Sequence, residues 1–134
     1  MSHLVIVGGS SGIGRDIDAP LTQRGHRVIQ LARRTQSLDW LTPDVSEFSL
    51  LFCQRYRGTD DWDGEFIASL TRTKKLMESA RGARSIVIMA SVAAVSVEEE
   101  QPVSYHACKA ALVEMAKYYA VTLGPKGVRV NAII

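Results

Sequence analysis

Apolar residues gather along the chain in short runs, most of which contain β-branched residues, and these alternate with longer segments where apolar residues recur every three or four positions. The short runs are typical of buried strands, because a strand of a parallel sheet is covered on both faces. The longer segments are typical of helices with one buried side. We therefore expect strands at 3–7, 26–32, 49–53, 85–90 and 128–134, and helices at 12–25, 65–80 and 105–124.

The amino-terminal segment combines these elements in the order strand, glycine-rich turn, helix, strand. This order predicts a βαβ unit, in which the two strands lie parallel and the crossover is right-handed. Pro20 lies inside the first helical segment and should bend or shorten it. Gly124 and Pro125 mark the end of the last helix. We expect an α/β fold built on a parallel sheet.

Composition and charge narrow the possible functions. The chain has 134 residues, of which 46% are apolar and 22% charged, as in an ordinary globular domain. The net charge is +2 and no run of lysine and arginine exceeds two residues, so we expect no nucleic-acid partner. Residues 1–9 (MSHLVIVGG) resemble neither a signal peptide nor a membrane anchor. A soluble, cytoplasmic protein without a membrane partner is expected.

The two cysteines carry little information about function. Cys53 and Cys108 are too few for a disulfide framework, and neither has metal-ligand spacing with the three histidines. We expect small packed side chains and no metal site.

A glycine-rich turn, VGGSSGIG at residues 7–14, follows the first strand and opens the first helix. Such a turn lets backbone N–H groups approach a pyrophosphate, because glycines permit the sharp bend and the close contacts. A turn with a purely structural role is the alternative interpretation. The expected cofactor-binding residues of the turn are Gly8, Ser10, Ser11, Gly12, Ile13 and Gly14.

The end of the second strand indicates which nicotinamide cofactor would bind. A carboxylate there suits the ribose 2′-hydroxyl of NAD, whereas arginine suits the 2′-phosphate of NADP. The sequence LARR has no acid and places Arg33 and Arg34 at this point. NADP is therefore favoured and NAD stays possible, unless the two arginines are simply solvated.

The sequence YHACK places Tyr105 and Lys109 four positions apart on the last helical segment, hence on one side of the helix. One interpretation is an exposed pair on a surface helix. The other is a tyrosine whose proton is easier to remove, because a neighbouring ammonium stabilises the phenolate.

Five motifs follow one another along the chain: VGGSSGIG, PDVS at 43–46, SIVIMAS at 85–91, YHACK, and GPKGVRVNAI at 124–133. In this order they resemble the short-chain dehydrogenase/reductase family. The resemblance implies a Rossmann-type, doubly wound parallel sheet with helices on both faces, as a single NAD(P)-binding domain over residues 1–134. It also implies hydride transfer between a nicotinamide and a small-molecule carbonyl or alcohol, and assembly as a homodimer or homotetramer.

The resemblance also suggests roles for individual residues. Ser91, Tyr105 and Lys109 match the catalytic serine, tyrosine and lysine, and the last two would also contact the cofactor. Asp44 and Val45 match a pair that contacts the adenine. In this scheme the tyrosine delivers the proton, the lysine stabilises the phenolate, and the serine holds the substrate oxygen.

The sequence departs from the family pattern after the strand at 49–53. Cys53 and Gln54 stand where an Asn-Asn-Ala-Gly motif is usual, and Ser69 stands where the family has a catalytic asparagine. Arg55 and Arg57 in the same segment face the cofactor or substrate, or belong to a solvated loop; the sequence leaves both open.

Length is a further departure. Only two residues separate Ser46 from Ser49, which leaves no room for the crossover helix that the family has before its fourth strand. We expect that this helix, the substrate loop and the last strand of the family are missing from the sequence. A non-catalytic NADP(H)-binding scaffold or sensor is accordingly the alternative function.

Overall fold

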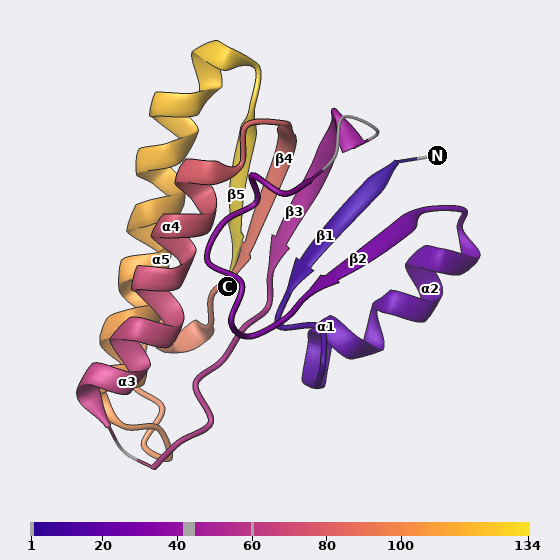
Figure 1. Cartoon of the computed structure of the whole chain (residues 1–134). Coiled ribbons are helices and arrows are strands. Elements are labelled where there is room, and N and C mark those ends of the chain that lie inside the picture. The colour runs from indigo at the N-terminus through magenta and orange to yellow at the C-terminus, as the bar shows by residue number, and fades with distance from the viewer. Residues whose placement is uncertain (1, 42–44, 60) are drawn as a thin grey trace.

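The computed structural model describes residues 2–41, 45–59 and 61–134, which fold around one sheet of five parallel strands (Figure 1). The strand order is β2-β1-β3-β4-β5, so the order reverses at β1. The strands are β1 (His3–Val7), β2 (Arg27–Leu31), β3 (Phe48–Phe52), β4 (Ala83–Met89) and β5 (Arg129–Ile133). All five expected strands are confirmed to within two residues of their predicted bounds.

The helices also follow the prediction, with one division. The predicted helix at 12–25 breaks at Ile17 into two short helices, and Pro20 lies in the first turn of the second. Proline is tolerated there because its missing N–H would have no partner in a first turn. The helices are α1 (Gly12–Asp16), α2 (Asp18–Gln23), α3 (Trp62–Phe66), the π-helical turn η2 (Ile67–Thr71), α4 (Arg72–Ser79), η3 (Val92–Ala94), α5 (Val103–Leu123) and η4 (Gly124–Lys126).

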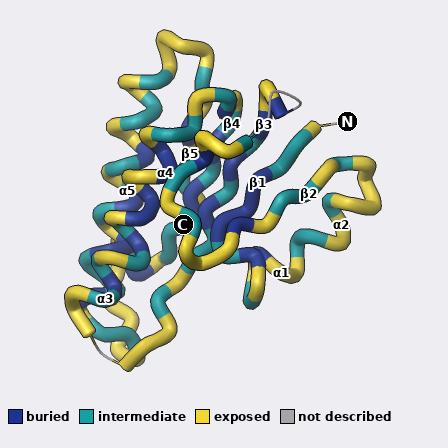
Figure 2. Tube along the Cα trace, viewed as in Figure 1, coloured by how far each residue is buried: buried dark blue, intermediate teal, exposed yellow. Residues whose placement is uncertain are grey.

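The main core lies between the sheet and the helices α4 and α5. Figure 1 shows these two helices on one face of the sheet and α1 and α2 on the other, which confirms the doubly wound α/β fold. Buried residues concentrate on the central strands and on the sides of α4 and α5 that face them (Figure 2). The core includes Val5, Val7, Phe48, Leu50, Phe52, Leu76, Met77, Ile86, Ile88, Leu112, Ala116 and Val130.

The connection from β2 to β3 crosses from one side of β1 to the other. Its described residues contain no α-helix. The buried Arg72 of α4 fastens this segment by donating hydrogen bonds to the carbonyl oxygens of Ala32 (2.6 Å) and Thr35 (3.3 Å). Leu38 is buried, and its N–H donates to the Ser79 hydroxyl at 2.9 Å. Side chains of α4 thus position the described part of this segment.

Candidate active site

A cleft of about 1000 Å³ opens at the carboxyl ends of the strands. Its walls come from the turn after β1, the end of β2, the segment after β3, the end of β4, and the helices α4 and α5. In an open parallel sheet, the ends of the strands on either side of the reversal in strand order form a crevice. The fold therefore creates this cleft at β1, beside the glycine-rich turn.

The charged residues that line the cleft are all basic. Among the described residues, the lining contains no aspartate or glutamate. A cavity surrounded by cations attracts anions and raises their local concentration. The basic lining residues are Arg33, Arg55, Arg57, Arg72, Lys75 and Lys109.

The glycine-rich turn requires glycine for steric reasons. Gly8 and Gly12 have positive φ angles of 85° and 56°, a region that other residues rarely adopt. A Cβ at Gly8 would lie 2.5 Å from Gln54 Cα, and a Cβ at Gly14 would overlap the carbonyl oxygen of Gly8. Ser10, Ser11, Gly12 and Ile13 line the cleft together with Gly8, whereas Gly14 is buried beneath the turn. The turn therefore presents its backbone to the cleft.

Tyr105 and Lys109 meet at the other end of the cleft, on the first two turns of α5. The Lys109 Nζ lies 5.4 Å from the centre of the Tyr105 ring and donates a hydrogen bond to the Met89 carbonyl oxygen at 3.2 Å. Lys109 is only 5% exposed. Burial lowers the pKa of the Lys109 ammonium, the nearby Glu65 opposes this, and the positive charge of Arg55 adds to it. The structure thus holds a desolvated cation beside the phenol ring.

Ser91 lies close to this pair in the fold but is not among the residues that line the cleft. It follows β4 by two residues and caps η3, where its Oγ accepts a hydrogen bond from the Ala93 N–H at 3.2 Å. The η3 turn packs against α5, the helix that carries Tyr105. That hydrogen bond uses a lone pair of the hydroxyl oxygen and leaves its hydrogen for another acceptor.

The other residues predicted for the adenosine end fall in different places. Arg33 lines the cleft, but Arg34 is exposed and is not part of the lining. Val45 is buried in the hydrophobic core and does not line the cleft, and its contact with the adenine stays a prediction. Asp44 lies outside the described residues.

Two basic residues of α4, which the sequence did not indicate as site residues, also line the cleft. Arg72 and Lys75 join Ala68 and Thr71 in the lining, at helical spacing along one side of η2 and α4. That spacing was visible in the sequence, but the side of the helix that faces the cleft was not. Burial lowers the pKa of the Arg72 guanidinium, and the charge of Arg33 adds to this shift, which places the two cations near each other.

Gln54 contributes a buried polar group with an open hydrogen-bond site. Its Nε2 donates to the Thr73 hydroxyl at 2.6 Å, while its Oε1 is buried without a partner among the described residues. Gln54 lines the cleft beside Gly8. Buried polar atoms are normally hydrogen-bonded, so an orphaned oxygen at a cleft wall suits a ligand donor.

Ser69 and Glu65 form a buried, hydrogen-bonded pair on the helical segment before β4. The Ser69 hydroxyl donates to the Glu65 carboxylate at 2.7 Å, and the two residues are 2% and 4% exposed. Glu65 lines a smaller cavity of about 390 Å³ that also includes Tyr105 and Arg55. Ser69 lies in the π-helical turn and lines neither cavity.

The described part of the chain holds no group of three or more side chains suited to a metal ion. Among the same residues, none of the helices has the length and apolar character that spanning a membrane requires.

Comparisons with known proteins identify relatives by sequence and by fold. A family model described as enoyl-(acyl carrier protein) reductase matches residues 65–134, just over half of the chain. No curated protein matches the chain.

Solved structures of similar fold cover 98% of this chain at about one-fifth identity, a level that supports the fold alone. A 4-hydroxyisoleucine dehydrogenase complexed with NADH has a TM-score of 0.81 and 21% identity, and 74% of it is covered. A short-chain dehydrogenase from Leptospira borgpetersenii with bound NAD⁺ has a TM-score of 0.77 and 20% identity, with 69% covered. BdcA in complex with NADPH has a TM-score of 0.70 and 21% identity, with 68% covered.

Proposed function

The chain belongs to the short-chain dehydrogenase/reductase family of oxidoreductases, and from this we propose that it reduces a carbonyl, or oxidises the corresponding alcohol, with NADP(H) as cofactor. Three features of the cleft fit a dinucleotide: the glycine turn that presents backbone, the wholly basic lining, and the orphaned Gln54 Oε1. Neighbours of the same fold carry NADH, NAD⁺ or NADPH. The reduced nicotinamide, when bound, supplies the hydride to the carbonyl carbon.

Tyr105 and Lys109 account for the proton in this reaction. The Tyr105 hydroxyl donates its proton to the carbonyl oxygen, which would otherwise develop negative charge as the hydride arrives. The Lys109 ammonium, 5.4 Å from the ring centre, stabilises the phenolate until solvent returns a proton. In the oxidising direction the phenolate takes the proton of the alcohol. The lysine also lies within the cleft, where it can contact the ribose of the cofactor.

Ser91 is assigned the third role, that of holding the substrate oxygen. Its hydroxyl hydrogen is not used in the bond from Ala93, and its turn packs on the helix that carries Tyr105. A hydroxyl donor directed at the oxygen would favour the charge that develops there.

The basic residues at the end of β2 favour NADP over NAD. Arg33 lies there in the lining, and Arg72 and Lys75 face the cleft from α4. No carboxylate among the described lining residues could accept hydrogen bonds from a ribose 2′-hydroxyl. A 2′-phosphate would complement these cations, and guanidinium groups bind phosphate through two parallel hydrogen bonds.

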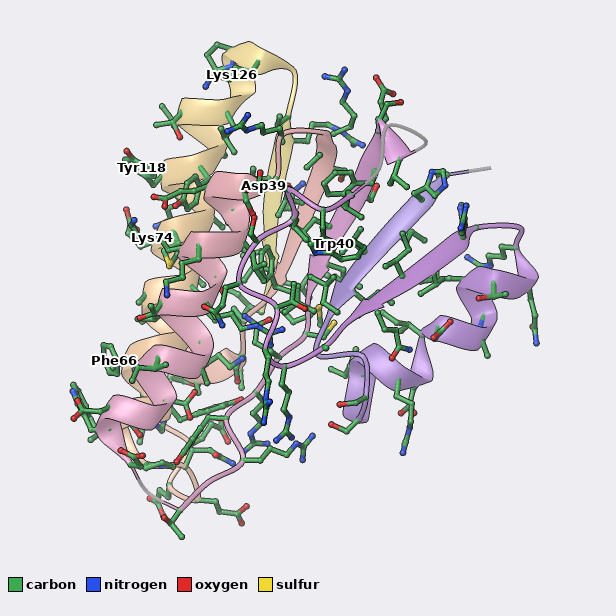
Figure 3. The ribbon with its side chains drawn as sticks, viewed as in Figure 1. Asp39, Trp40, Phe66, Lys74, Tyr118 and Lys126 are labelled. Atoms are coloured by element: carbon green, nitrogen blue, oxygen red, sulfur yellow. The ribbon has the colours of Figure 1, made fainter. Side chains whose placement is uncertain are left out.

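The observation that carries the proposal is the position of Tyr105 beside a buried lysine at the edge of a basic cleft. Tyr105→Phe should lower NADPH turnover roughly 10²–10⁴-fold and leave NADPH affinity nearly unchanged, because only the transferred proton is lost. Turnover is followed as loss of NADPH absorbance with a panel of ketones and aldehydes, and affinity by calorimetry. Figure 3 shows Tyr118 on the outer side of α5, so Tyr118→Phe is the matched control. Unchanged turnover in Tyr105→Phe would refute the assignment.

A non-catalytic NADP(H)-binding scaffold or sensor is the second candidate. It is favoured by the position of Ser91 outside the cleft lining and by the loss of the usual asparagine motif to Cys53 and Gln54. Binding of NADPH without turnover across the carbonyl panel would support this candidate against the enzyme.

We also propose assembly into a homodimer or homotetramer through α5. Its apolar residues Val103, Tyr118 and Val121 are 71%, 63% and 75% exposed, and a second copy of the helix could cover them. Light scattering on the purified protein tests this, and a monomeric mass at all concentrations would exclude it.

A further inference from the structure

We infer that Arg57 binds the pyrophosphate of the cofactor from above the glycine turn, as an added side-chain contact to the same phosphates that the turn binds through its backbone. The inference rests on the proposed nicotinamide cofactor and assigns a ligand to a residue whose role the sequence left open.

The position of the guanidinium relative to the turn is the first support. A Cβ placed on Gly12 would lie 3.3 Å from Arg57 Nη2, so the guanidinium stands directly over the backbone at this glycine. Gly12 has no side chain to separate the two groups. Arg57 and the turn residues Gly8, Ser10 and Ser11 line the same cleft. A phosphate placed against the turn would therefore lie within reach of the guanidinium.

The charges around Arg57 are the second support. None of the four ion pairs found among the described residues involves it, and no carboxylate in the described lining of the cleft would neutralise it. Arg57 is exposed and lies in a segment, residues 53–59, that forms neither helix nor strand. Its guanidinium can therefore adjust its position to a ligand. A pyrophosphate carries two negative charges, and arginine binds phosphate oxygens in bidentate geometry.

Arg57 and Arg33 occupy different parts of the cleft and should recognise different phosphates. Arg33 follows β2, at the adenosine end, whereas Arg57 stands over the turn after β1. The pyrophosphate is common to NADH, NADPH and ADP-ribose, and the 2′-phosphate occurs only in NADPH. Loss of Arg57 should therefore weaken all three ligands equally, while loss of Arg33 should weaken NADPH alone.

Calorimetric titration of the full chain with ADP-ribose, NADH and NADPH tests the inference. Arg57→Gln should raise Kd about 10-fold for each ligand, since a charge-assisted contact at an exposed site is lost. The difference should shrink at high salt because exposed charges are screened. Arg57→Lys should recover part of the affinity, as it keeps the charge but not the bidentate geometry.

Arg15→Gln is the matched control, because Arg15 is an exposed arginine of α1 that does not line the cleft. It should leave all three Kd values unchanged. Unchanged ADP-ribose affinity in Arg57→Gln, or weakening confined to NADPH, would overturn the inference.

The titrations also separate this inference from the proposed function. Wild-type protein that binds ADP-ribose and NADPH but never oxidises NADPH would refute the enzyme, while the effect of Arg57→Gln on ADP-ribose would still decide the present inference. Wild-type protein that binds none of the three ligands would overturn both.

Discussion

Two crossovers that each join a pair of neighbouring parallel strands differ sharply in how many of their residues are buried. The first joins β1 to β2 through α1 and α2, where Gly14 is the one buried helical residue. The second joins β4 to β5 through η3, the 21-residue α5 and η4. Five residues of α5 are buried: Ser104, Cys108, Lys109, Leu112 and Ala116.

The difference corresponds to what each crossover presents to the cleft. The first crossover presents the backbone of a turn, whose shape is fixed by the close contacts at Gly8 and Gly14. A turn held in this way needs few buried residues in the helices that follow it. The second offers the side chains of Tyr105 and Lys109, which must be held at a fixed separation. A long helix packed on the sheet provides that rigidity. A crossover that binds a ligand through its backbone therefore needs less packing than one that must hold two reactive side chains at a fixed separation.

Among changes to the two crossovers themselves, the largest effect on stability is expected in the core of the second. Leu112 is 3% exposed and packs between α5 and the sheet. Leu112→Ala should lower the free energy of unfolding by about 2–5 kcal/mol, because buried apolar contacts are lost and a cavity remains. Urea unfolding followed by circular dichroism measures the change. A loss below about 1 kcal/mol would show that α5 is packed no more tightly than α2.

The next effect should appear in the first crossover as lost binding. Gly14→Ala would place a Cβ against the Gly8 carbonyl and 2.9 Å from Gly9 Cα, and the turn would have to shift. We expect NADPH affinity to fall at least about 10-fold, which corresponds to about 1.4 kcal/mol.

Gly124→Ala is the control for that substitution, since a Cβ at Gly124 meets nothing within 4 Å. It should leave the Kd unchanged. Equal affinities for the two variants in fluorescence titration would contradict a steric role for Gly14.

A smaller effect concerns the pH dependence of the second crossover. Burial lowers the pKa of Lys109 from its ordinary value of 10.5, and Arg55 contributes to this lowering. Lys109 carries its charge below that pKa and loses it above, so activity should fall on the alkaline side earlier than an ordinary lysine would allow. Arg55→Gln removes a repelling charge and should move this alkaline limb to higher pH. The measurement is the pH profile of kcat/KM for both proteins. If the alkaline fall in Arg55→Gln stays at the same pH or moves to lower pH, the assigned effect of Arg55 on the pKa of Lys109 is contradicted.

The smallest effect is expected for the apolar side of α2. Leu21 is only partly buried, and no residue of α2 is fully buried. Leu21→Ala should therefore cost under about 1 kcal/mol of unfolding free energy, well below the cost of Leu112→Ala. The same urea titration compares the two variants. Equal losses would remove the contrast between the crossovers.

Local sequence patterns predicted most of the fold. Short apolar runs located the five strands, because the strands of a parallel sheet are covered on both faces. The break in the first helix was expected from Pro20, but it occurs at Ile17, since proline fits the first turn of the helix that follows. The π-helical turn at Ile67–Thr71 had no signal in the sequence, as it depends on how the helix packs.

Predictions of individual site residues were less complete. Of the neighbouring arginines after β2, Arg33 lines the cleft and Arg34 does not. Both arginines lie in the turn after β2, which the hydrogen bond from the Thr35 N–H to the Ala32 carbonyl oxygen closes at 3.0 Å, so the conformation of this turn decides which of them faces the cleft. Val45, expected near the adenine, lies in the core and outside the cleft lining, which its position in the sequence did not reveal.

The sequence by itself determined the order of strands and helices, the sterically required glycine turn, and the four-residue spacing of Tyr105 and Lys109. These depend on interactions between residues close along the chain. Only the tertiary structure decided that Arg33, Arg57 and Lys75, from three separate segments, line one cleft without a carboxylate among its described residues. Their convergence depends on the reversal of strand order at β1 and on which side of α4 faces the cleft, and neither is set by local spacing.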